Sequence, residues 1–276
     1  MKKLTLQKIN KKEFTQMLKQ MLMVDRFITL RIGTENTDTT SYLPQHDVVK
    51  RLVIANESLF ASSSEPLEKP FRISLNDGNN LINRLANYGE NEDVDLQLTY
   101  DDSEDAENYV VYANLISERL TTRIFCADKR FMNAMKPLGD SVIARLIDTD
   151  GCDFTFEFGA DMIADVQTLN KLDPNNKFCI YRTEKERLYI SERVSDSDVE
   201  HEGSEDKDAY GYNMFLVNME GVADKEYRCG KNIFTVTPKC DMSVSVCGNA
   251  KKVVYEGTED NEHIWLIAVL TNAPTA

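Results

Sequence analysis

The sequence predicts an α+β fold built from two similar halves, each of which closes with an antiparallel β-meander. The stretch Cys240–Leu270 contains three runs of β-branched and aromatic residues, separated by turn-forming residues at Gly248–Asn249 and at 257–261. A comparable series of three runs occupies 94–126. Each series follows a helical pattern, so the order of elements repeats although few residues are identical between the halves.

Length and composition are those of a two-domain globular protein. A chain of 276 residues can form two domains of ordinary size, each with its own core. Its 42% hydrophobic and 28% charged residues are typical of soluble proteins, and no apolar run approaches the roughly 18–20 residues of a membrane span. The N-terminal segment lacks the continuous apolar stretch of a signal peptide. We therefore expect a cytoplasmic protein that does not contact membranes.

The net charge of −14 predicts an acidic surface. Such a surface repels phosphates, which excludes simple electrostatic adhesion to DNA or to anionic membranes. Binding to DNA remains possible if the positive charge is gathered on one face of the protein.

The first half begins with a predicted strand at Leu4–Ile9, where apolar and polar residues alternate. Asn10, with Glu13 three positions later, has the spacing of a capping box and predicts a helix that begins near Lys11. The apolar face of this helix contains Phe14, Met17, Leu18, Met21 and Leu22, and the opposite face contains Lys12, Thr15, Gln16 and Lys19. One face is therefore core and the other is basic.

A second helix is predicted at Asp77–Tyr88, where apolar residues recur at helical spacing from Leu81 to Ala86 and Gly89 follows as the C-cap. The segment 62–70, with three serines and two prolines, predicts a loop. The strands predicted in this half are Phe27–Ile32, Val48–Ala55, Phe71–Ser74, Val94–Tyr100, Tyr109–Leu115 and Thr121–Cys126.

Between the halves, 127–150 lacks the alternation of strands and contains Pro137 and Gly139, which predicts a connector. The acidic run Asp196–Asp208 predicts a solvated loop. The second half is otherwise predicted to contain strands at Cys152–Phe158, Phe178–Arg182, Leu188–Val194 and Tyr212–Met219, a helix at Gly159–Leu172, a helical turn near Gly230–Phe234 and the closing meander.

No residue pattern predicts catalysis. The six cysteines are scattered and only three histidines could complete a metal site, so we expect reduced, structural thiols. Acidic clusters at 101–105 and at Asp148 and Asp150 could suggest a two-metal nuclease, but they lie in hydrophilic turns without a suitably spaced Lys or His. The chain has neither a phosphate-binding loop nor a nucleophile elbow motif. We expect a non-enzymatic protein without a metal or a cofactor.

Three stretches carry a resemblance to a known family: LTLQKINKKEFTQMLKQM at the start, 72–115 in the first half and DMSVSVCGNAKKVVYEGTEDNEHIWLIAVL at the end. In these stretches the chain resembles the sliding clamps, and most closely the DNA polymerase processivity factors of T-even-type bacteriophages. The resemblance covers almost the whole chain. None of the stretches is a short diagnostic motif, so its specificity comes from several elements that occur in the right order.

The resemblance implies two domains of the DNA-clamp type, 1–127 and 151–276, joined by an interdomain connector at 128–150. It implies a ring, usually a homotrimer, with antiparallel sheets outside and helices lining a central hole that encircles duplex DNA. Lysines confined to the inner helices would let an acidic ring slide, because few tight phosphate contacts form.

The residues expected on the inner surface are Lys8, Lys11, Lys12, Lys19, Arg84, Lys171 and Lys231. Taken singly, each of these residues is explained as well by an ordinary solvated surface. The helix predicted at Gly159–Leu172 departs from the family pattern, because it carries Asp161 and Asp165 and only Lys171 as a base.

The resemblance also implies that a DNA polymerase and a clamp loader bind an apolar pocket near the connector and the last strand. The candidate residues are Leu138, Val142, Val269 and Leu270, although Val142 also belongs to a helical apolar stripe with Ile143 and Leu146 that is typical of an ordinary core. The implied function is a clamp that gives the replicative polymerase processivity, in the host cytoplasm if the protein is viral. The alternative is a β-rich phage or bacterial interaction or structural protein that does not encircle DNA.

Overall fold

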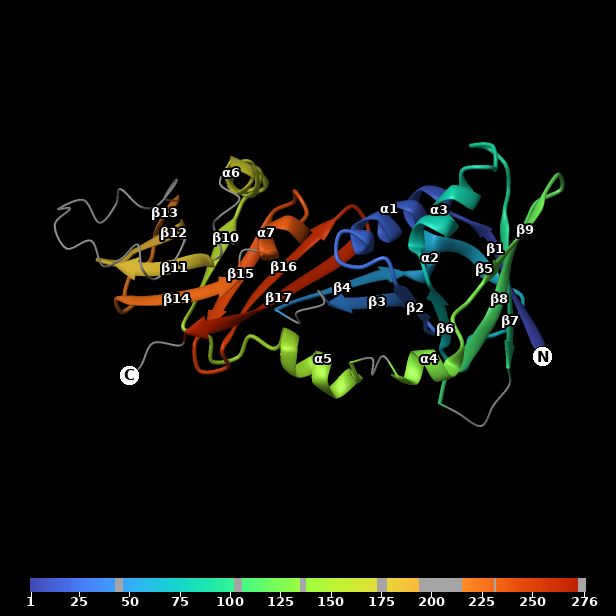
Figure 1. The fold of residues 1–276 in the computed structure, drawn as a ribbon, viewed down its shortest axis with the longest axis horizontal. Coiled ribbons are helices and arrows are strands. Elements are labelled where there is room, and N and C mark those ends of the chain that lie inside the picture. Colours follow the sequence, from blue (N-terminus) through green and yellow to red (C-terminus); the bar gives the residue numbers. More distant parts are fainter. Residues whose placement is uncertain are drawn as a thin grey trace. The chain divides into compact units, whose positions relative to one another are not determined.

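The computed structural model describes residues 1–42, 47–101, 106–134, 138–172, 178–193, 215–230 and 232–272. The chain divides into two compact units. The first unit contains 1–43, 50–140 and 259–264, and the second contains 44–49, 141–258 and 265–276. Each unit combines antiparallel strands with a few helices (Figure 1). The described helices are all too short or too polar to cross a membrane.

The first unit holds two groups of strands. The strands are β1 (Lys2–Ile9), β2 (Ile28–Ile32), β3 (Asn36–Tyr42), all but the start of β4 (Val48–Ala55), β5 (Phe60–Ser63), β6 (Phe71–Leu75), β7 (Asp95–Asp101), β8 (Asn108–Ile116) and β9 (Thr121–Phe125). β1 pairs antiparallel with β5 and β7, and β7, β8 and β9 form the predicted meander. β2 pairs with β3 and β6, and a short parallel pairing of β6 with β8 joins the two groups.

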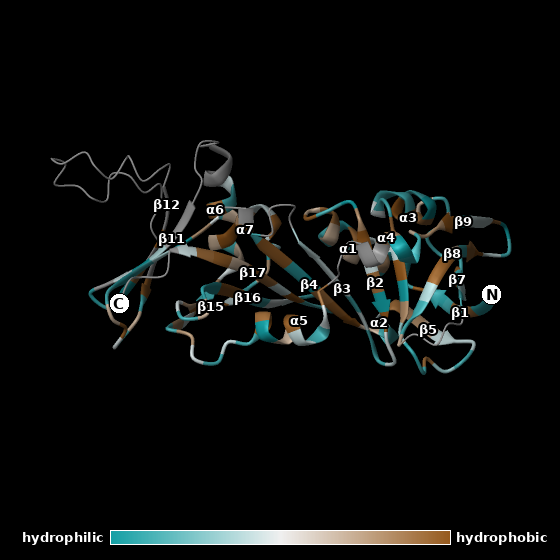
Figure 2. Cartoon of the chain, turned by 60° about the horizontal axis from the view of Figure 1, so that its bottom comes forward, coloured by the Kyte–Doolittle hydropathy of each residue, from teal (hydrophilic) through white to brown (hydrophobic). Residues whose placement is uncertain are grey.

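The helices of the first unit are α1 (Lys11–Leu22), α2 (Asn56–Leu59), α3 (Gly78–Leu85) and α4 (Lys129–Ala134). Figure 1 shows α1 and α3 side by side, and the two helices contact each other. Phe14 and Met17 of α1 are buried with Leu6 of β1 and Leu98 of β7 in one hydrophobic core. In Figure 2 brown and teal bands alternate along the strands of this unit, whereas the loops at their ends are mostly teal.

The second unit has the strands β10 (Phe154–Phe158), β11 (Phe178–Glu184), β12 (Arg187–Arg193), β13 (Phe215–Asn218), β14 (Lys225–Gly230), β15 (Met242–Cys247), β16 (Lys252–Glu259) and most of β17 (Glu262–Asn272). Its helices are α5 (Asp140–Ile147), α6 (Ala160–Leu172) and α7 (Asn232–Val236). β15 pairs with β10 and β16, and β11 pairs with β12 and β14. The last strand is covered on both faces over 266–268, where Leu266, Ile267 and Ala268 are all buried.

The predicted repetition of element order is confirmed. Leaving aside α5, which precedes β10, both units contain a strand, a helix and three further strands in this order: β1, α1 and β2–β4 in the first, and β10, α6 and β11–β13 in the second. Later in both units a helix is followed by a three-stranded meander, which is α3 and β7–β9 in the first and α7 and β15–β17 in the second, and α4 comes after the first meander. The observed architecture is therefore the α+β fold with two similar parts that the sequence predicted.

Some strands carry no strong apolar signal and were not predicted. β3 has the sequence NTDTTSY, and its inward positions are the buried hydroxyl residues Thr37, Thr39 and Ser41. β14 was also absent from the prediction. β5 includes Ser62 and Ser63, so the loop expected at 62–70 begins later than predicted. The acidic run Asp196–Asp208 lies outside the described residues.

The expectation that all cysteines are reduced is wrong for one pair. Cys152 and Cys247 form a disulfide in the second unit, across the pairing of β10 with β15. The two cysteines are 95 residues apart in the chain, and only strand pairing brings them together. Cys126, Cys229 and Cys240 are not disulfide-bonded.

The predicted connector contains α4 and the amphipathic helix α5. Lys252 of β16, which is 8% exposed, closes the C-terminal end of α5. Its ammonium group donates hydrogen bonds to the carbonyl oxygens of Arg145 at 2.7 Å and Leu146 at 3.1 Å, and to that of Asp148. A cation at this end of a helix donates hydrogen bonds to the terminal carbonyls and interacts favourably with the negative end of the helix dipole.

Candidate nucleic-acid interface

The polar face of α1 is set by how the helix begins. The Asn10 side chain accepts a hydrogen bond from the backbone amide of Glu13 at 3.3 Å, which is one half of the predicted capping box. The other half is absent because the Asn10 amide donates to the Leu59 carbonyl at 2.7 Å. With the apolar face of α1 buried, Lys12 and Lys19 remain exposed on the other face.

Helix α3 begins as predicted but ends earlier. The Asp77 side chain accepts a hydrogen bond from the Asn79 amide at 2.9 Å and caps the helix. The helix ends at Leu85, and the Asn87 and Tyr88 amides bond three residues back in a tighter turn, so the prediction of Tyr88 as its end and Gly89 as its C-cap was wrong.

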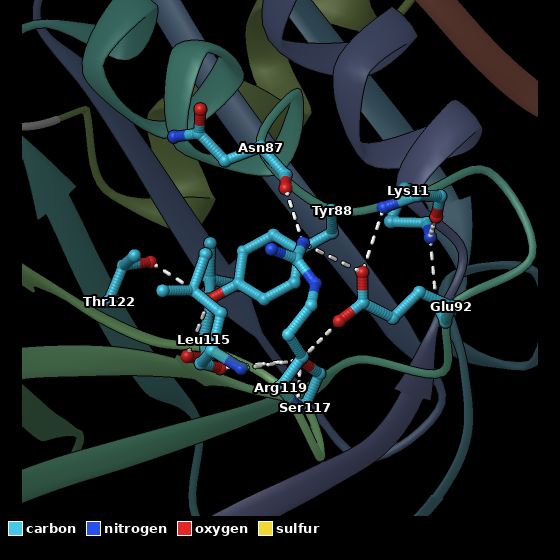
Figure 3. A network of polar contacts seen from close by, with 10 residues as sticks. Lys11, Asn87, Tyr88, Glu92, Leu115, Ser117, Arg119 and Thr122 are labelled. Atoms are coloured by element: carbon cyan, nitrogen blue, oxygen red, sulfur yellow. Dashed lines mark hydrogen bonds and ion pairs between the residues drawn. The ribbon is translucent and has the colours of Figure 1, made fainter.

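Lys11 of α1 binds the loop that follows α3. The Lys11 ammonium group donates hydrogen bonds to the carbonyl oxygens of Gly89 and, at 2.7 Å, Glu92 (Figure 3). These carbonyls follow α3, whereas Lys11 is the first residue of α1. The contact therefore links the start of one helix to the segment that ends the other.

Glu92 extends this link to the β8–β9 turn. Its carboxylate accepts hydrogen bonds from the Gly89 amide at 2.8 Å, the Arg119 guanidinium at 3.2 Å and the Ser117 hydroxyl. These donors lower the pKa of Glu92 to about 2, with the Ser117 hydrogen bond as the largest cause. Figure 3 shows Lys11, Glu92 and Arg119 close together, so the network joins the start of α1, the loop after α3 and the β8–β9 turn.

A groove of about 990 Å³ runs beside α1 and α3 in the first unit. The lysines that line it are Lys8, Lys11, Lys12 and Lys19. The acids that line it are Glu90, Glu92, Asp93, Glu259 and Asp260. The groove is therefore mixed in charge rather than uniformly basic.

The lysines of the groove differ in their availability to a ligand. Lys8 forms an ion pair with Asp93 at 2.8 Å, and Lys11 is held by the carbonyls described above. Lys12 and Lys19 are exposed and make no hydrogen bond or ion pair with another described residue. Arg84 lies half-buried in the last turn of α3. Among the predicted residues, the structure thus brings Lys12 and Lys19 to one surface as free cations.

In the second unit, the predicted basic residues lie at the limits of the described chain. Lys171 is in the last turn of α6, and Lys231 lies outside the described residues. Asp161 and Asp165 of α6 are exposed. Gln167 joins α6 to α7, since its amide donates to the carbonyls of Phe234 at 3.1 Å and Thr237 at 2.7 Å.

The predicted partner-binding residues have different environments. Leu138 is half-buried in the first unit, and Val142 is half-buried on α5 in the second. Val269 is 50% exposed, whereas its neighbour Leu270 is 2% exposed because successive residues of β17 face opposite sides. Of the two strand residues, Val269 is the accessible one.

Some residues of this region carry no signal in the sequence, because their roles depend on distant partners. Glu92 looked like one acid among several in a turn, and Gln16 and Gln20 looked like ordinary polar positions of α1. In the structure, Gln16 and Gln20 hold Asp260 and Glu259, about 240 residues further along the chain. The local signals in this region were the N-x-x-E spacing at the start of α1 and the apolar stripe along the helix.

Within the part of the chain that the structure describes, no group of three or more His, Cys, Asp or Glu side chains is arranged to hold a metal ion.

Three solved structures share the fold over nearly their entire length. Proliferating Cellular Nuclear Antigen from Entamoeba histolytica aligns with a TM-score of 0.65 and 10% identity, over 98% of this chain and 99% of that one. The A. fulgidus PCNA bound to the C-terminal region of FEN-1 gives 0.62 and 9%, over 99% and 100%. The PCNA2–PCNA3 complex from Sulfolobus tokodaii gives 0.58 and 12%, over 97% and 99%.

No protein-family model matches the chain, and no curated protein matches it at a significant level. At 9–12% identity the structural likeness establishes the fold and nothing finer. The chain has the fold of the sliding clamps.

Proposed function

We propose that this protein is a sliding clamp that encircles duplex DNA and tethers a DNA polymerase during replication. The observation that carries the proposal is the likeness to clamp structures over 97% or more of this chain and 99% or more of the others. A likeness of this extent includes both halves and the connector. The proposal includes the domain boundaries 1–127, 128–150 and 151–276.

The charge of the α1–α3 groove suits a clamp. Lys12 and Lys19 can each approach a phosphate, while the nearby carboxylates keep the total attraction low. Contacts to phosphates carry no sequence information, so weak contacts of this kind allow movement along any duplex. Lys8, Lys11, Arg84, Lys171 and Lys231 remain candidates, of which Lys8 and Lys11 would have to exchange their present partners.

The ring would form by pairing between chains. β9 pairs with β8 on one side, and its other edge has no strand partner within the described residues. An unpaired edge strand with an exposed aromatic residue, here Phe125, is a ready surface for another chain. The S. tokodaii complex shows that chains of this fold assemble with one another. We propose a homotrimer of this chain.

Replication partners would dock near the connector. The A. fulgidus structure holds a C-terminal region of FEN-1, so a chain of this fold can bind a terminal segment of another protein. We propose that a polymerase and a clamp loader bind through Leu138, Val142 and Val269, with Leu270 supporting from the core. The sequence resemblance to T-even-type phage clamps supports a phage origin and action in the host cytoplasm.

A DNA-retention experiment tests the function. The protein, with a T-even-type phage loader and ATP, would be loaded on nicked circular DNA, and bound protein would be measured after gel filtration, before and after linearisation. Retention on the circle and loss on linearisation are expected, because a ring is held topologically and slides off an end. Equal retention on both forms, or none on either under conditions where the phage's own clamp loads, would favour the interaction or structural protein.

The two groove lysines provide a finer test. Lys12→Gln with Lys19→Gln should weaken equilibrium duplex binding roughly tenfold and lower the slope of log K against log salt by about 2, since two phosphate contacts are lost. The matched control, Lys3→Gln with Lys239→Gln, removes the same charge from exposed sites outside the groove and should change neither quantity. If both pairs weaken binding equally, general charge and not the groove attracts DNA.

A further inference from the structure

The tip of the β16–β17 hairpin is attached to α1 within the first unit. The Gln16 amide donates a hydrogen bond to the Asp260 carboxylate at 3.0 Å, and the Gln20 amide donates to the Glu259 carboxylate at 2.8 Å. Asp260 has a φ of 51°, so the chain reverses sharply there before β17 begins at Glu262. The hairpin tip, defined here as residues 259–262, thus rests on the helix that carries the groove lysines.

Next to these hydrogen bonds, the carboxyl group of Glu262 is buried without a hydrogen-bond partner among the described residues. Glu262 has no exposed surface. Glu13 of α1 is also buried, and one of its oxygens is likewise without a partner. An ionised carboxylate in such a place loses its hydration without replacement, which costs far more than burying the protonated acid.

The charged groups that face Glu262 come from three elements. They are Glu13 from α1, Lys50 from β4, and Glu259 and Asp260 from the turn. Lys50 is the single cation among them, and it also donates to the Gln20 side chain at 2.8 Å. Burial first, and then the Glu259 carboxylate, raise the pKa of Glu262 to about 7, although Lys50 opposes the shift. With one cation for four acids, the cluster favours a proton on Glu262.

We propose that the hairpin tip is a proton-controlled latch on α1, docked while Glu262 is protonated and loosened when Glu262 ionises. Undocking exposes the carboxyl to water, where its pKa returns to the ordinary value near 4.5. The docked state therefore binds the proton more tightly, and docking weakens as the pH rises between these two values. The latch does not depend on whether the protein encircles DNA.

Hydrogen exchange of the intact protein tests the latch. Amides in peptides that cover 257–264 should lose protection roughly tenfold between pH 6 and pH 8, after correction for intrinsic exchange rates, because the docking constant changes by about that factor. Glu262→Gln cannot ionise and should keep the same protection at both pH values. The matched control Glu57→Gln, which removes an exposed carboxyl from the same unit, should behave as the wild type.

A titration of the unmodified protein keeps the test valid if the variant fails to fold. The side-chain carboxyl carbon of Glu262, followed by NMR, should titrate with a midpoint near pH 7. A midpoint near 4.5, or protection of the tip that does not change between pH 6 and pH 8 in the wild type, would overturn the proposal. So would a Glu262→Gln protein that retains the full pH dependence.

Discussion

At the scale of single residues, the first unit uses two carboxyl groups in opposite ways. Glu92 is surrounded by donors that stabilise its ionised form, whereas Glu262 is buried among other acids and favours its protonated form. The difference comes from the neighbours and not from the residue type. Both groups lie in segments that contact α1, since Lys11 binds the Glu92 carbonyl and Gln16 binds Asp260.

The Glu92 network predicts a specific acid sensitivity. Because the pKa of Glu92 is lowered to about 2 in the folded state, its contribution to stability is fully present above its ordinary pKa of about 4.5. That contribution is lost as the pH falls toward 2. Glu92→Gln should therefore unfold at a lower urea concentration than the wild type at pH 7, and the difference should shrink as the pH falls below about 4.5.

Urea titrations at a series of pH values measure this difference, and Glu90→Gln is the matched control. Glu90 is exposed, lies two residues away in the same turn and should leave the midpoint unchanged. A gap between wild type and Glu92→Gln that stays constant down to pH 2 would contradict the role given to the ionised carboxylate.

At the scale of elements, Lys252 decides how firmly α5 is held. The side chain is almost fully buried, and its ammonium group donates hydrogen bonds to the last carbonyls of that helix. Burial lowers the pKa of Lys252, so the structure tolerates this cation only because the carbonyls receive it. A charged hydrogen bond of this kind contributes about 2 kcal/mol.

Lys252→Met should lower the free energy of unfolding by about 2 kcal/mol and speed amide exchange in α5, because the methionine fills the space without donating. Urea unfolding and hydrogen exchange measure the two effects. Lys239→Met, at an exposed position of the same unit, should change neither. Unfolding at the wild-type midpoint would mean that the carbonyls find water or other donors instead.

Among the helices and strands, the sequence predicted those with local signals and not those without. α1 was found because its cap residue and its apolar stripe are local signals, separated by a few positions. β3 was not found because hydroxyl residues fill its inward positions, where Thr37 donates to the side chain of Asn56 at 2.8 Å. Polar strands of this kind are stabilised by partners from elsewhere in the chain, which a local pattern does not reveal.

The sequence predicted the exposed lysines of the candidate site but not the contacts that Lys11 makes with a distant loop. Lys12 and Lys19 follow from the helical periodicity that buries the opposite face of α1. The capture of Lys11 by the Gly89 carbonyl joins residues 78 positions apart, and no spacing rule predicts it. The end of α3 was misplaced because the apolar spacing continues to Ala86 and Gly89 resembles a C-cap, whereas the helix ends at Leu85.

At the scale of the whole molecule, the acidic composition and the mixed charge of the groove both keep the attraction to DNA weak. A net charge of −14 keeps most of the surface repulsive to DNA, and the exposed lysines of α1 are balanced by carboxylates in the same groove. A protein that bound phosphates tightly would stay where it landed. Weak attraction inside a closed ring is compatible with both retention and movement, so assembly is the property on which the proposed function depends.

Assembly predicts that a single charge on the β9 edge will break the ring. Phe125 is 70% exposed, and an aspartate at that position would place an unpaired charge in an apolar contact between chains without disturbing the core. Light scattering should give about three times 31.5 kDa for the wild type and the mass of one chain for Phe125→Asp, with unchanged circular dichroism. Val269→Asp alters a similarly exposed apolar residue at the proposed partner site and should leave the trimer intact. If Phe125→Asp keeps the wild-type mass, the chains do not meet at β9, and a ring built through this edge is excluded.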